Sequence, residues 1–164
     1  MKMATSYLFI VGIIGALTTG FLSDWLVKRK GLRFGRRFIA IIALGVTGLC
    51  LLIAAYAANN ALVAMSLIVG YLFFSTHGVI AYSVCVDIGG NYASTVAGIM
   101  NFCGQTGSFF LALSFGKIAD ITHSYTMSLV ILSIVLFTGS LLWLATDPGK
   151  RLVKEKDPFT EPVV

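Results

Sequence analysis

Two amide side chains are the residues of this sequence best placed for binding chemistry. Asn101 and Gln105 stand four residues apart in a long uncharged stretch, so they share one face of a helix, and Gly98 and Ser108 extend that stripe. Amides inside a membrane cost free energy unless they meet partners or water. Interhelical hydrogen bonds average only about 0.6 kcal/mol, a weak reason to keep two amides together. We therefore expect Asn101 and Gln105 to contact a substrate in a polar cavity, with interhelical hydrogen bonding as the alternative.

A second polar stripe lies in another long apolar stretch. Tyr71, Ser75 and Tyr82 fall on one face of a helix, at spacings of four and eleven residues. His77 lies among them, and a histidine inside a membrane either relays protons or stays neutral and hydrogen-bonded. We favour the neutral, hydrogen-bonded interpretation. The candidate substrate-lining residues of this stretch are Tyr71, Ser75, Thr76, His77 and Tyr82.

The composition places both stripes in a membrane. The 164 residues are 57% hydrophobic and only 12% charged, whereas soluble domains average about 25% charged residues. A helix needs roughly 20 apolar residues to cross the hydrocarbon core of a bilayer. This composition excludes a secreted domain, a disordered chain and a cytosolic enzyme. Four long stretches contain no Asp, Glu, Lys or Arg: Met3–Ser23, Phe38–Val86, Ile88–Gly116 and Ile121–Thr146.

The longest uncharged stretch, Phe38–Val86, must contain a turn. As a single helix it would be about 74 Å long, more than twice the thickness of the core. The Asn59-Asn60 pair is the natural turn, because asparagine favours turn geometry. We therefore predict an all-α membrane protein with five transmembrane helices in residues 1–146, followed by a solvated cytoplasmic tail at 147–164. The predicted spans are about 4–25, 37–57, 61–83, 95–116 and 125–146.

The basic residues predict the orientation. Ten of the twelve Lys and Arg lie in the loop after the first span or in the tail, on one side of the membrane, and only Lys2 and Lys117 lie on the other. Because basic residues favour the cytoplasmic side, we expect a multi-pass cell-membrane protein with a cytoplasmic tail and an outside N-terminus, which hints at missing sequence. This distribution accounts for the net charge of +5, so nucleic acid is not an expected partner.

The sequence contains no recognisable catalytic or metal-binding pattern. Asp24, Asp87 and Asp120 are dispersed over both faces, and no Ser-His-Asp, HExxH or phosphate-loop arrangement occurs. The three cysteines lack the spacing of a metal site or a redox pair. We expect no enzyme activity, no metal and no cofactor.

Small residues at helical spacing indicate close helix packing. Gly12 and Ala16 in the first span, and Gly98 and Gly104 in the fourth, would let neighbouring backbones approach. In a transporter, such helix faces also slide past one another when the protein switches between access states. Close packing and this movement are therefore overlapping explanations of the small residues.

A short internal repeat links the first and fourth spans. Gly20–Asp24 and Gly116–Asp120 both have the pattern Gly-x-Leu/Ile-Ser/Ala-Asp, yet they lie on opposite sides of the membrane. Inverted repeats are typical of secondary transporters. If the first span matches the fourth and the second matches the fifth, the third needs a partner ahead of the first.

Two motifs resemble the major facilitator superfamily. The Gly20–Asp24 segment and the basic loop ending at Gly35–Arg37 are similar to its signature loop between two helices on the cytoplasmic side, with a longer spacing than the consensus. The Asp87–Gly107 region resembles the start of the eleventh helix in its anion:cation symporter branch, where Gly-Thr-x-x-Gly-Ile-x-Asn-x-x-Gly is typical. Ser94 replaces the first glycine of that pattern, and the matching residues are Thr95, Gly98, Ile99, Asn101 and Gly104.

The resemblance implies helices eight to twelve of a twelve-helix transporter, and hence a fragment without the amino-terminal half. It implies cation-coupled alternating access for a small organic anion, such as a hexuronate, another sugar acid or a carboxylate. The implied partners are H⁺ or Na⁺ as the coupling cation, the missing amino-terminal helical bundle and the lipid bilayer. Asp24 would pair with Arg29, Arg36 or Arg37 as a conformational latch, or be a plain interfacial residue. The implied latch residues are Gly20, Asp24, Arg29, Arg36, Arg37 and Asp87.

One alternative of a different class stays open. The chain could be a small non-transporting membrane protein that acts in assembly or regulation and associates through its glycine faces. Under the transporter hypothesis we expect the chain alone not to transport, because half of the implied cavity lies outside it and intramembrane charge is scarce.

Overall fold

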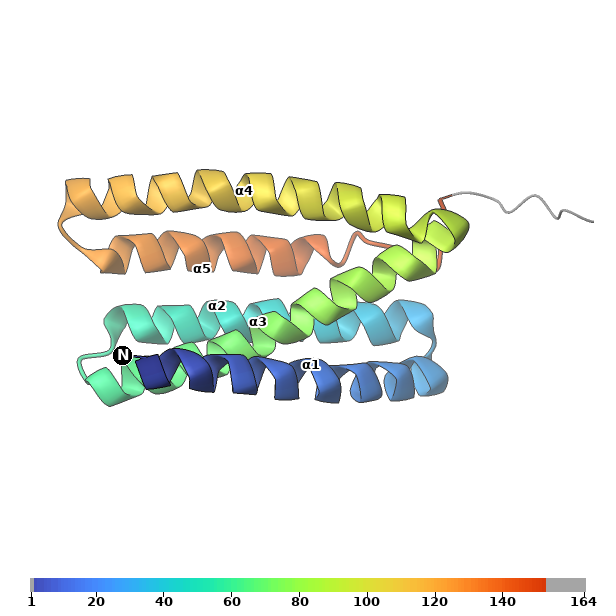
Figure 1. Cartoon of the computed structure of the whole chain (residues 1–164), viewed down its shortest axis with the longest axis horizontal. Coiled ribbons are helices and arrows are strands. Elements are labelled where there is room, and N and C mark those ends of the chain that lie inside the picture. Colours follow the sequence, from blue (N-terminus) through green and yellow to red (C-terminus); the bar gives the residue numbers. More distant parts are fainter. Residues whose placement is uncertain (1, 153–164) are drawn as a thin grey trace, which may run out of the picture.

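The protein is all-helical over residues 2–152, which are the residues that the computed structural model describes. Successive helices run back and forth as a bundle, and the stretch after the last helix lies at one end of it (Figure 1). Residues 153–164, which include Lys154 and Lys156 of the predicted tail, lie outside the described residues. The elements are α1 (Lys2–Lys30), α2 (Leu32–Tyr56), α3 (Asn60–Gly89), the short 3₁₀ turn η1 (Gly90–Tyr92), α4 (Ala93–Thr122) and α5 (Tyr125–Leu142).

The helices end where side chains or backbone geometry satisfy the free backbone groups. The predicted turn at Asn59 is present, because its side chain accepts a hydrogen bond from the Ala61 amide at 2.9 Å and so caps α3. Ser124 caps α5 in the same way, accepting from the Thr126 amide at 3.2 Å. Between α1 and α2 the chain turns at Gly31, whose φ of 87° is a conformation that side chains disfavour.

Four helical segments within residues 2–152 are long and apolar enough to cross a membrane. One of them, Asn60–Thr122, is 63 residues long and contains α3, η1 and α4. The helix axis reverses within this segment, since α3 and α4 meet at η1 and then diverge toward the other end of the bundle (Figure 1). The predicted all-helical membrane bundle is therefore observed.

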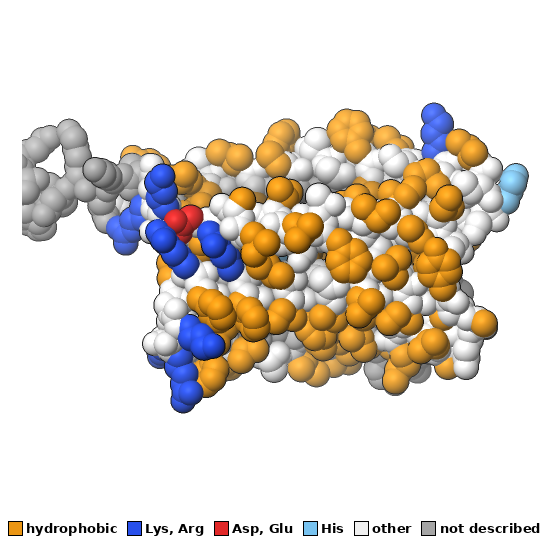
Figure 2. All heavy atoms as spheres, turned by 180° about the vertical axis from the view of Figure 1, so that it is seen from behind, with side chains coloured by type: hydrophobic (Ala, Val, Ile, Leu, Met, Phe, Trp, Pro, Cys, Tyr) orange, Lys and Arg blue, Asp and Glu red, His pale blue; other side chains and the backbone are white. Residues whose placement is uncertain are grey.

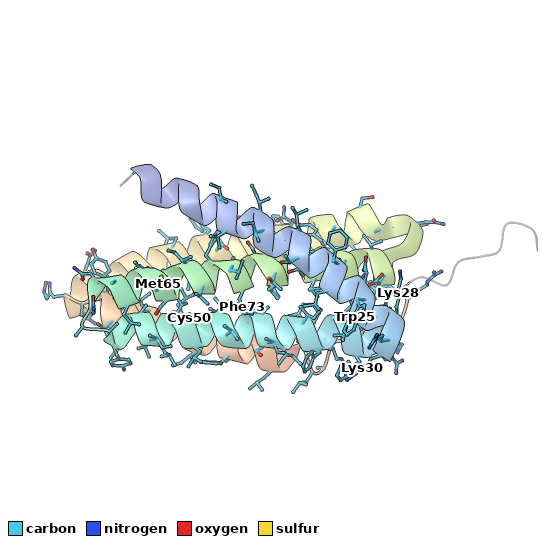
Figure 3. The ribbon with its side chains drawn as sticks, turned by 90° about the horizontal axis from the view of Figure 1, so that it is seen from below. Trp25, Lys28, Lys30, Cys50, Met65 and Phe73 are labelled. Atoms are coloured by element: carbon cyan, nitrogen blue, oxygen red, sulfur yellow. The ribbon has the colours of Figure 1, made fainter. Side chains whose placement is uncertain are left out.

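The centre of the bundle is formed by α2 and α3. Helix α2 packs against α1, α3 and α5, and α3 packs against α1, α2 and α4. A buried apolar cluster joins the two central helices, with Ile39 and Ala40 on α2 meeting Ile80 and Val84 on α3. Helix α1 converges on α2 toward the end that carries Trp25, Lys28 and Lys30 (Figure 3). The same end contains the apolar cluster, because Leu26 of α1 packs against it.

Hydroxyl groups connect α2 to its neighbours in the apolar interior. Ser140 donates to the Ile41 carbonyl oxygen at 2.9 Å, and Ser133, seven residues earlier on the same face of α5, donates to the Gly48 carbonyl oxygen. Because water is absent from the hydrocarbon region, such donors must find protein acceptors. These serines join α5 to α2, a contact that the sequence analysis did not predict.

Two glycines of α1 lie close against α3. A Cβ atom at Gly12 would lie 2.9 Å from the ring of Tyr71, and one at Gly15 would lie 3.0 Å from the Leu72 carbonyl oxygen. These glycines therefore let α1 approach the backbone of α3 closely, as small residues do in membrane bundles. Ala16, also predicted to pack there, is half-buried.

The two glycines of α4 that were predicted to pack against a neighbouring helix have open space around them. A Cβ atom at Gly98 or Gly104 would meet nothing within 4 Å in the part of the chain that the structure describes. Their role in helix packing stays a prediction.

Candidate functional site

Most of the charged side chains that the structure describes gather at one end of the bundle. Figure 2 shows most of the visible Lys and Arg side chains over this end, whereas the long face turned toward the viewer is largely hydrophobic. The end is built from the last turn of α1, the first turns of α2, the last turn of α3 and the stretch that follows α5. The residues predicted to form the latch lie toward this end.

Arg36 is the central residue of this charged end. Its Nε donates to Asp87 Oδ2 of α3 at 3.0 Å, and its Nη1 donates to Ser23 Oγ of α1 at 2.6 Å. The same Nη1 lies 3.5 Å from Asp24 Oδ1. The Arg36 side chain is only 11% exposed and that of Asp87 19%, whereas Asp24 is 68% exposed. One guanidinium therefore joins three helices, and Asp87 is its principal carboxylate partner. We call Ser23, Asp24, Arg36 and Asp87 the Arg36 cluster.

The other arginines that the sequence offered as partners of Asp24 have different contacts. Arg29 stacks on the Trp25 ring, with its guanidinium carbon 4.4 Å from the ring centre. Arg37 donates through Nε to the Thr146 carbonyl oxygen in the stretch after α5. Of the three alternatives for Asp24, the geometry thus selects Arg36. Sequence spacing alone could not make this choice, because all three arginines lie within the same short loop.

Gly35 is a residue of the site whose role the sequence analysis missed. A Cβ atom at this position would lie 2.7 Å from Val27 Cγ2 and 2.9 Å from the Val27 backbone nitrogen. Glycine therefore lets the start of α2 lie against the end of α1, which brings Arg36 next to Ser23. The resemblance also placed Gly20 in the latch. Within the described residues, a Cβ atom at Gly20 would meet nothing within 4 Å, so no close contact there requires glycine. The sequence feature that could have indicated this role is the position of Gly35 directly before Arg36 and Arg37.

Three of the predicted substrate-lining residues lie where α1 contacts α3. The Thr19 hydroxyl donates to Thr76 Oγ1 at 2.9 Å, and Ser75 Oγ lies 3.2 Å from the position of a Cβ atom on Gly12. Tyr71 packs against the same glycine. An open cavity of about 300 Å³ adjoins this contact, lined mainly by apolar side chains of α1, α2 and α3 together with Thr18, Thr19 and Thr76.

His77 accepts a hydrogen bond in this structure. The indole Nε1–H of Trp143, just after α5, donates to His77 Nε2 at 3.1 Å, and the two rings meet edge-on with centres 5.7 Å apart. An indole nitrogen can only donate, so Nε2 must carry a lone pair and the imidazole is neutral in this arrangement. This geometry matches the favoured sequence interpretation of His77 as a neutral, hydrogen-bonded residue.

Asn101 and Gln105 lie on an exposed part of α4. Every residue from Asn101 to Phe110 is exposed, and among the elements of residues 2–152, α4 packs against its chain neighbours α3, η1 and α5 and against no other. Between α4 and the rest of the bundle is an open groove of about 590 Å³, lined by residues of α2, α3, α4 and α5 that include Tyr71, Gly104 and Ser108. The two amides lie beside the groove-lining residues of α4, and their contact with a substrate stays a prediction.

Tyr82, another of the predicted substrate-lining residues, is 49% exposed on α3. Within the described residues, no group of three or more His, Cys, Asp or Glu side chains could hold a metal ion.

The sequence is similar to those of several transporters. It is 29% identical over 153 residues to a probable sulfoacetate transporter of Cupriavidus necator, 28% over 139 residues to a probable L-galactonate transporter of Escherichia coli, and 31% over 134 residues to a hexuronate transporter of Bacillus subtilis. The matches cover 90%, 83% and 77% of this chain but only 35%, 30% and 31% of the relatives. The chain therefore spans about a third of their length. No protein-family model matches it.

These relatives agree with the motif-based resemblance. All three are named as transporters and none as an enzyme, in agreement with the lack of catalytic patterns in the sequence. Long apolar helices and transporter relatives together make the chain a multi-pass membrane protein. It is homologous, over about a third of their length, to sugar-acid and anion transporters, which agrees with the motifs that resemble the major facilitator superfamily.

Proposed function

We propose that the chain forms part of a cation-coupled transporter that moves a small organic anion, of the sugar-acid or carboxylate class, by alternating access. The observation that carries the proposal is the similarity to three transporters named for sulfoacetate, L-galactonate and hexuronate. Each of these names denotes a small organic acid with at least one acidic group. The coupling cation is H⁺ or Na⁺.

The chain crosses the cell membrane five times in this proposal. The Asn60–Thr122 segment has 63 residues and would be roughly 95 Å long as one straight helix, about three times the hydrocarbon thickness. The reversal at η1, where Gly90 has a φ of 52°, supports two crossings by α3 and α4. The basic residues at the α1–α2 turn and after α5 share one end of the bundle, which supports a cytoplasmic location for that end.

The substrate site is proposed at the amide stripe of α4. No Lys or Arg lies within the four uncharged stretches of the sequence, so this chain offers hydrogen-bond donors rather than a positive charge at mid-membrane depth. Asn101 and Gln105 would donate to the oxygen atoms of the organic acid. The charge that balances the anion would come from a second helical bundle, in keeping with the relatives' threefold greater length.

The groove beside α4 supports a helical partner. In the inverted repeat, α1 corresponds to α4 and α2 to α5, which leaves α3 without a counterpart. Helix α3 packs on both α1 and α2, so its counterpart would pack on α4 and α5. The 590 Å³ groove is bounded by α4 and α5, with Gly104 and Gly107 on its α4 wall, and small residues suit a closely packed helix.

The Arg36 cluster is proposed to be the conformational latch. It joins the cytoplasmic ends of α1, α2 and α3 through one arginine. Ser23 and Asp24 both belong to α1, so movement of α1 would break the Ser23 hydrogen bond and the exposed Asp24 pair, which contributes little, while the Arg36–Asp87 pair stays closed. The latch would thus favour one access state without locking it.

A chimeric transporter tests the proposal. The chain replaces the matched third of the Bacillus subtilis hexuronate transporter, and uptake of labelled hexuronate is measured in cells that lack their own transporter. We expect saturable uptake, and a drop of at least tenfold when Asn101→Ala and Gln105→Ala are combined. Thr106→Ala is the matched control, because Thr106 is exposed on the same helix and donates to its own helix at Phe102. Full uptake by the double variant would refute the assigned substrate site.

Two further measurements separate the parts of the proposal. Imposing a proton gradient or a sodium gradient on vesicles with the chimera identifies the coupling cation, and uptake that responds to neither would refute coupling. The chain alone, reconstituted in liposomes, should show no saturable uptake, since a second bundle is required. Saturable uptake by the chain alone would refute that requirement.

A further inference from the structure

The stretch that follows α5 folds back onto the bundle. We call Trp143–Leu152 the strap. Its backbone turns are internally hydrogen-bonded, with the Ala145 amide donating to the Leu142 carbonyl at 3.0 Å and the Lys150 amide to the Asp147 carbonyl at 3.2 Å. Pro148 is among the fully buried side chains. The stretch from residue 147, expected to be a solvated tail, has one buried side chain at Pro148, whereas residues 149–152 are exposed.

Two contacts fasten the strap to α2. Arg33 Nε lies 2.8 Å from Asp147 Oδ1, in an ion pair whose side chains are 67% and 31% exposed. Arg37, one helical turn further along, donates to the Thr146 carbonyl oxygen. Successive turns of α2 therefore bind successive residues of the strap.

Two further contacts fasten the strap to α3. Its first residue, Trp143, donates to His77 Nε2 at 3.1 Å, and its last, Leu152, donates through its backbone amide to the Ile88 carbonyl oxygen at 3.0 Å. The Trp143 ring also packs against the buried cluster of Ile39, Ala40, Ile80 and Val84. The strap thus spans from one central helix to the other.

Three of the four fastening points adjoin the Arg36–Asp87 pair in sequence, and the fourth, His77, lies further along α3. On α2, Arg33 and Arg37 lie three residues before and one residue after Arg36, and on α3, Ile88 directly follows Asp87. An ion pair between two helices persists only while the helix ends stay in register. We propose that the strap is a positioning element that holds the ends of α2 and α3 together and thereby keeps the Arg36 cluster assembled. Its importance for transport rests on the proposed function of that cluster as a latch, but its structural action does not.

Hydrogen exchange of the full chain in detergent or nanodiscs tests the proposal. The variants are Asp147→Asn, which removes the ion pair to Arg33, and Trp143→Phe, which removes the donor to His77 and keeps an aromatic ring. Losing one such contact should speed amide exchange about threefold to fivefold, and losing both about tenfold or more. The increase should be confined to the last turns of α3 and residues 36–40 of α2, while residues 128–139 of α5 keep their exchange rates.

A charge exchange provides the control for folding. Arg33→Asp combined with Asp147→Arg restores the ion pair with reversed charges, so exchange should return toward the wild-type rate. Equal acceleration in residues 128–139 of α5 would show general destabilisation and overturn the proposal. Unchanged exchange at the ends of α2 and α3 in the Asp147→Asn, Trp143→Phe variant would overturn it as well.

A disulfide measures the strap contact independently. In a Cys103→Ser background, Ile88→Cys and Leu152→Cys should cross-link readily, because the backbones of these residues are hydrogen-bonded. Failure to cross-link would overturn the placement of the strap. A chimera that transports nothing yet shows the predicted exchange pattern would refute the transport proposal and leave the strap proposal standing.

Discussion

Replacement of Arg36 by methionine is the most informative perturbation of this protein. Its Nε lies 3.0 Å from Asp87 Oδ2, a separation at which two unit charges attract by about 5 kcal/mol at an effective dielectric constant of about 20. Part of this energy offsets the desolvation of both groups, but removing one partner leaves the other unpaired. Because Asp87 is 19% exposed, water can reach it in part. We therefore expect Arg36→Met to lower the free energy of unfolding by about 3 kcal/mol.

Arg33→Met is the matched control. It is the same substitution on the same helix and also removes an ion pair, yet the Arg33 side chain is 67% exposed. Exposed pairs contribute at most about 1 kcal/mol, so the two variants differ in the burial of the ion pair and in the Ser23 hydrogen bond, which only Arg36 makes. The two carboxylates of the Arg36 cluster should differ in the same way, with Asp87→Asn costing about 2 to 3 kcal/mol and the exposed Asp24→Asn under about 1 kcal/mol.

Unfolding by a denaturing detergent, followed by tryptophan fluorescence, measures these differences. The chain has two tryptophans, Trp25 beside Arg29 and Trp143 beside His77, and both lie near the charged end. Equal losses for Arg36→Met and Arg33→Met, within about 0.5 kcal/mol, would refute the argument that burial makes the Arg36 pair strong. Equal losses for the two Asp→Asn variants would refute the assignment of Asp87 as the principal partner.

Three other perturbations have defined outcomes. Gly35→Ala should destabilise the chain by about 1 to 3 kcal/mol in the same assay, because the new Cβ would meet backbone atoms of α1 within 3.0 Å, whereas Gly20→Ala should change stability by less than about 0.5 kcal/mol. Ser133→Ala should cost about 0.6 to 1.7 kcal/mol through loss of its bond to α2, and Thr138→Ala, whose hydroxyl bonds only its own helix, should cost less; the reverse order would contradict the role of the serine. A water-soluble maleimide should label exposed Cys103 and spare the two buried cysteines of the folded chain in detergent; equal labelling of all three would contradict the burial of Cys50 and Cys85 between the helices.

Local sequence rules predicted most of the helical elements. The uncharged stretches predicted membrane-crossing helices, and the Asn59 cap was predictable because a side chain and a backbone amide two residues apart need no tertiary partner. The end of α5 was less predictable. The apolar stretch continues to Thr146, but the α-helix ends at Leu142, and the chain goes on in tighter turns in which the amides of Leu144, Ala145 and Thr146 each donate to the carbonyl three residues earlier.

The candidate site was predictable in its residue types but not in its pairing. The sequence placed Asp24, Asp87 and the arginines at one end of the membrane, which charge distribution alone determines. It left three possible partners for Asp24 and none for Asp87. The pair that formed, Arg36 with Asp87, joins residues 51 positions apart, and such a contact depends on how α2 and α3 pack.

By itself, the sequence determined that this protein is a helical membrane bundle with its charges at one end, because hydrophobicity and charge act residue by residue. Only the tertiary structure decided which arginine is buried, which serines join α2 to α5, and that the stretch after α5 lies across the ends of α2 and α3. Those choices require two helices to meet at a given depth and rotation, and that geometry is set by close contacts such as Gly12 with Tyr71 and Gly35 with Val27. Such contacts join residues that are not adjacent in the chain, so no local pattern specifies them.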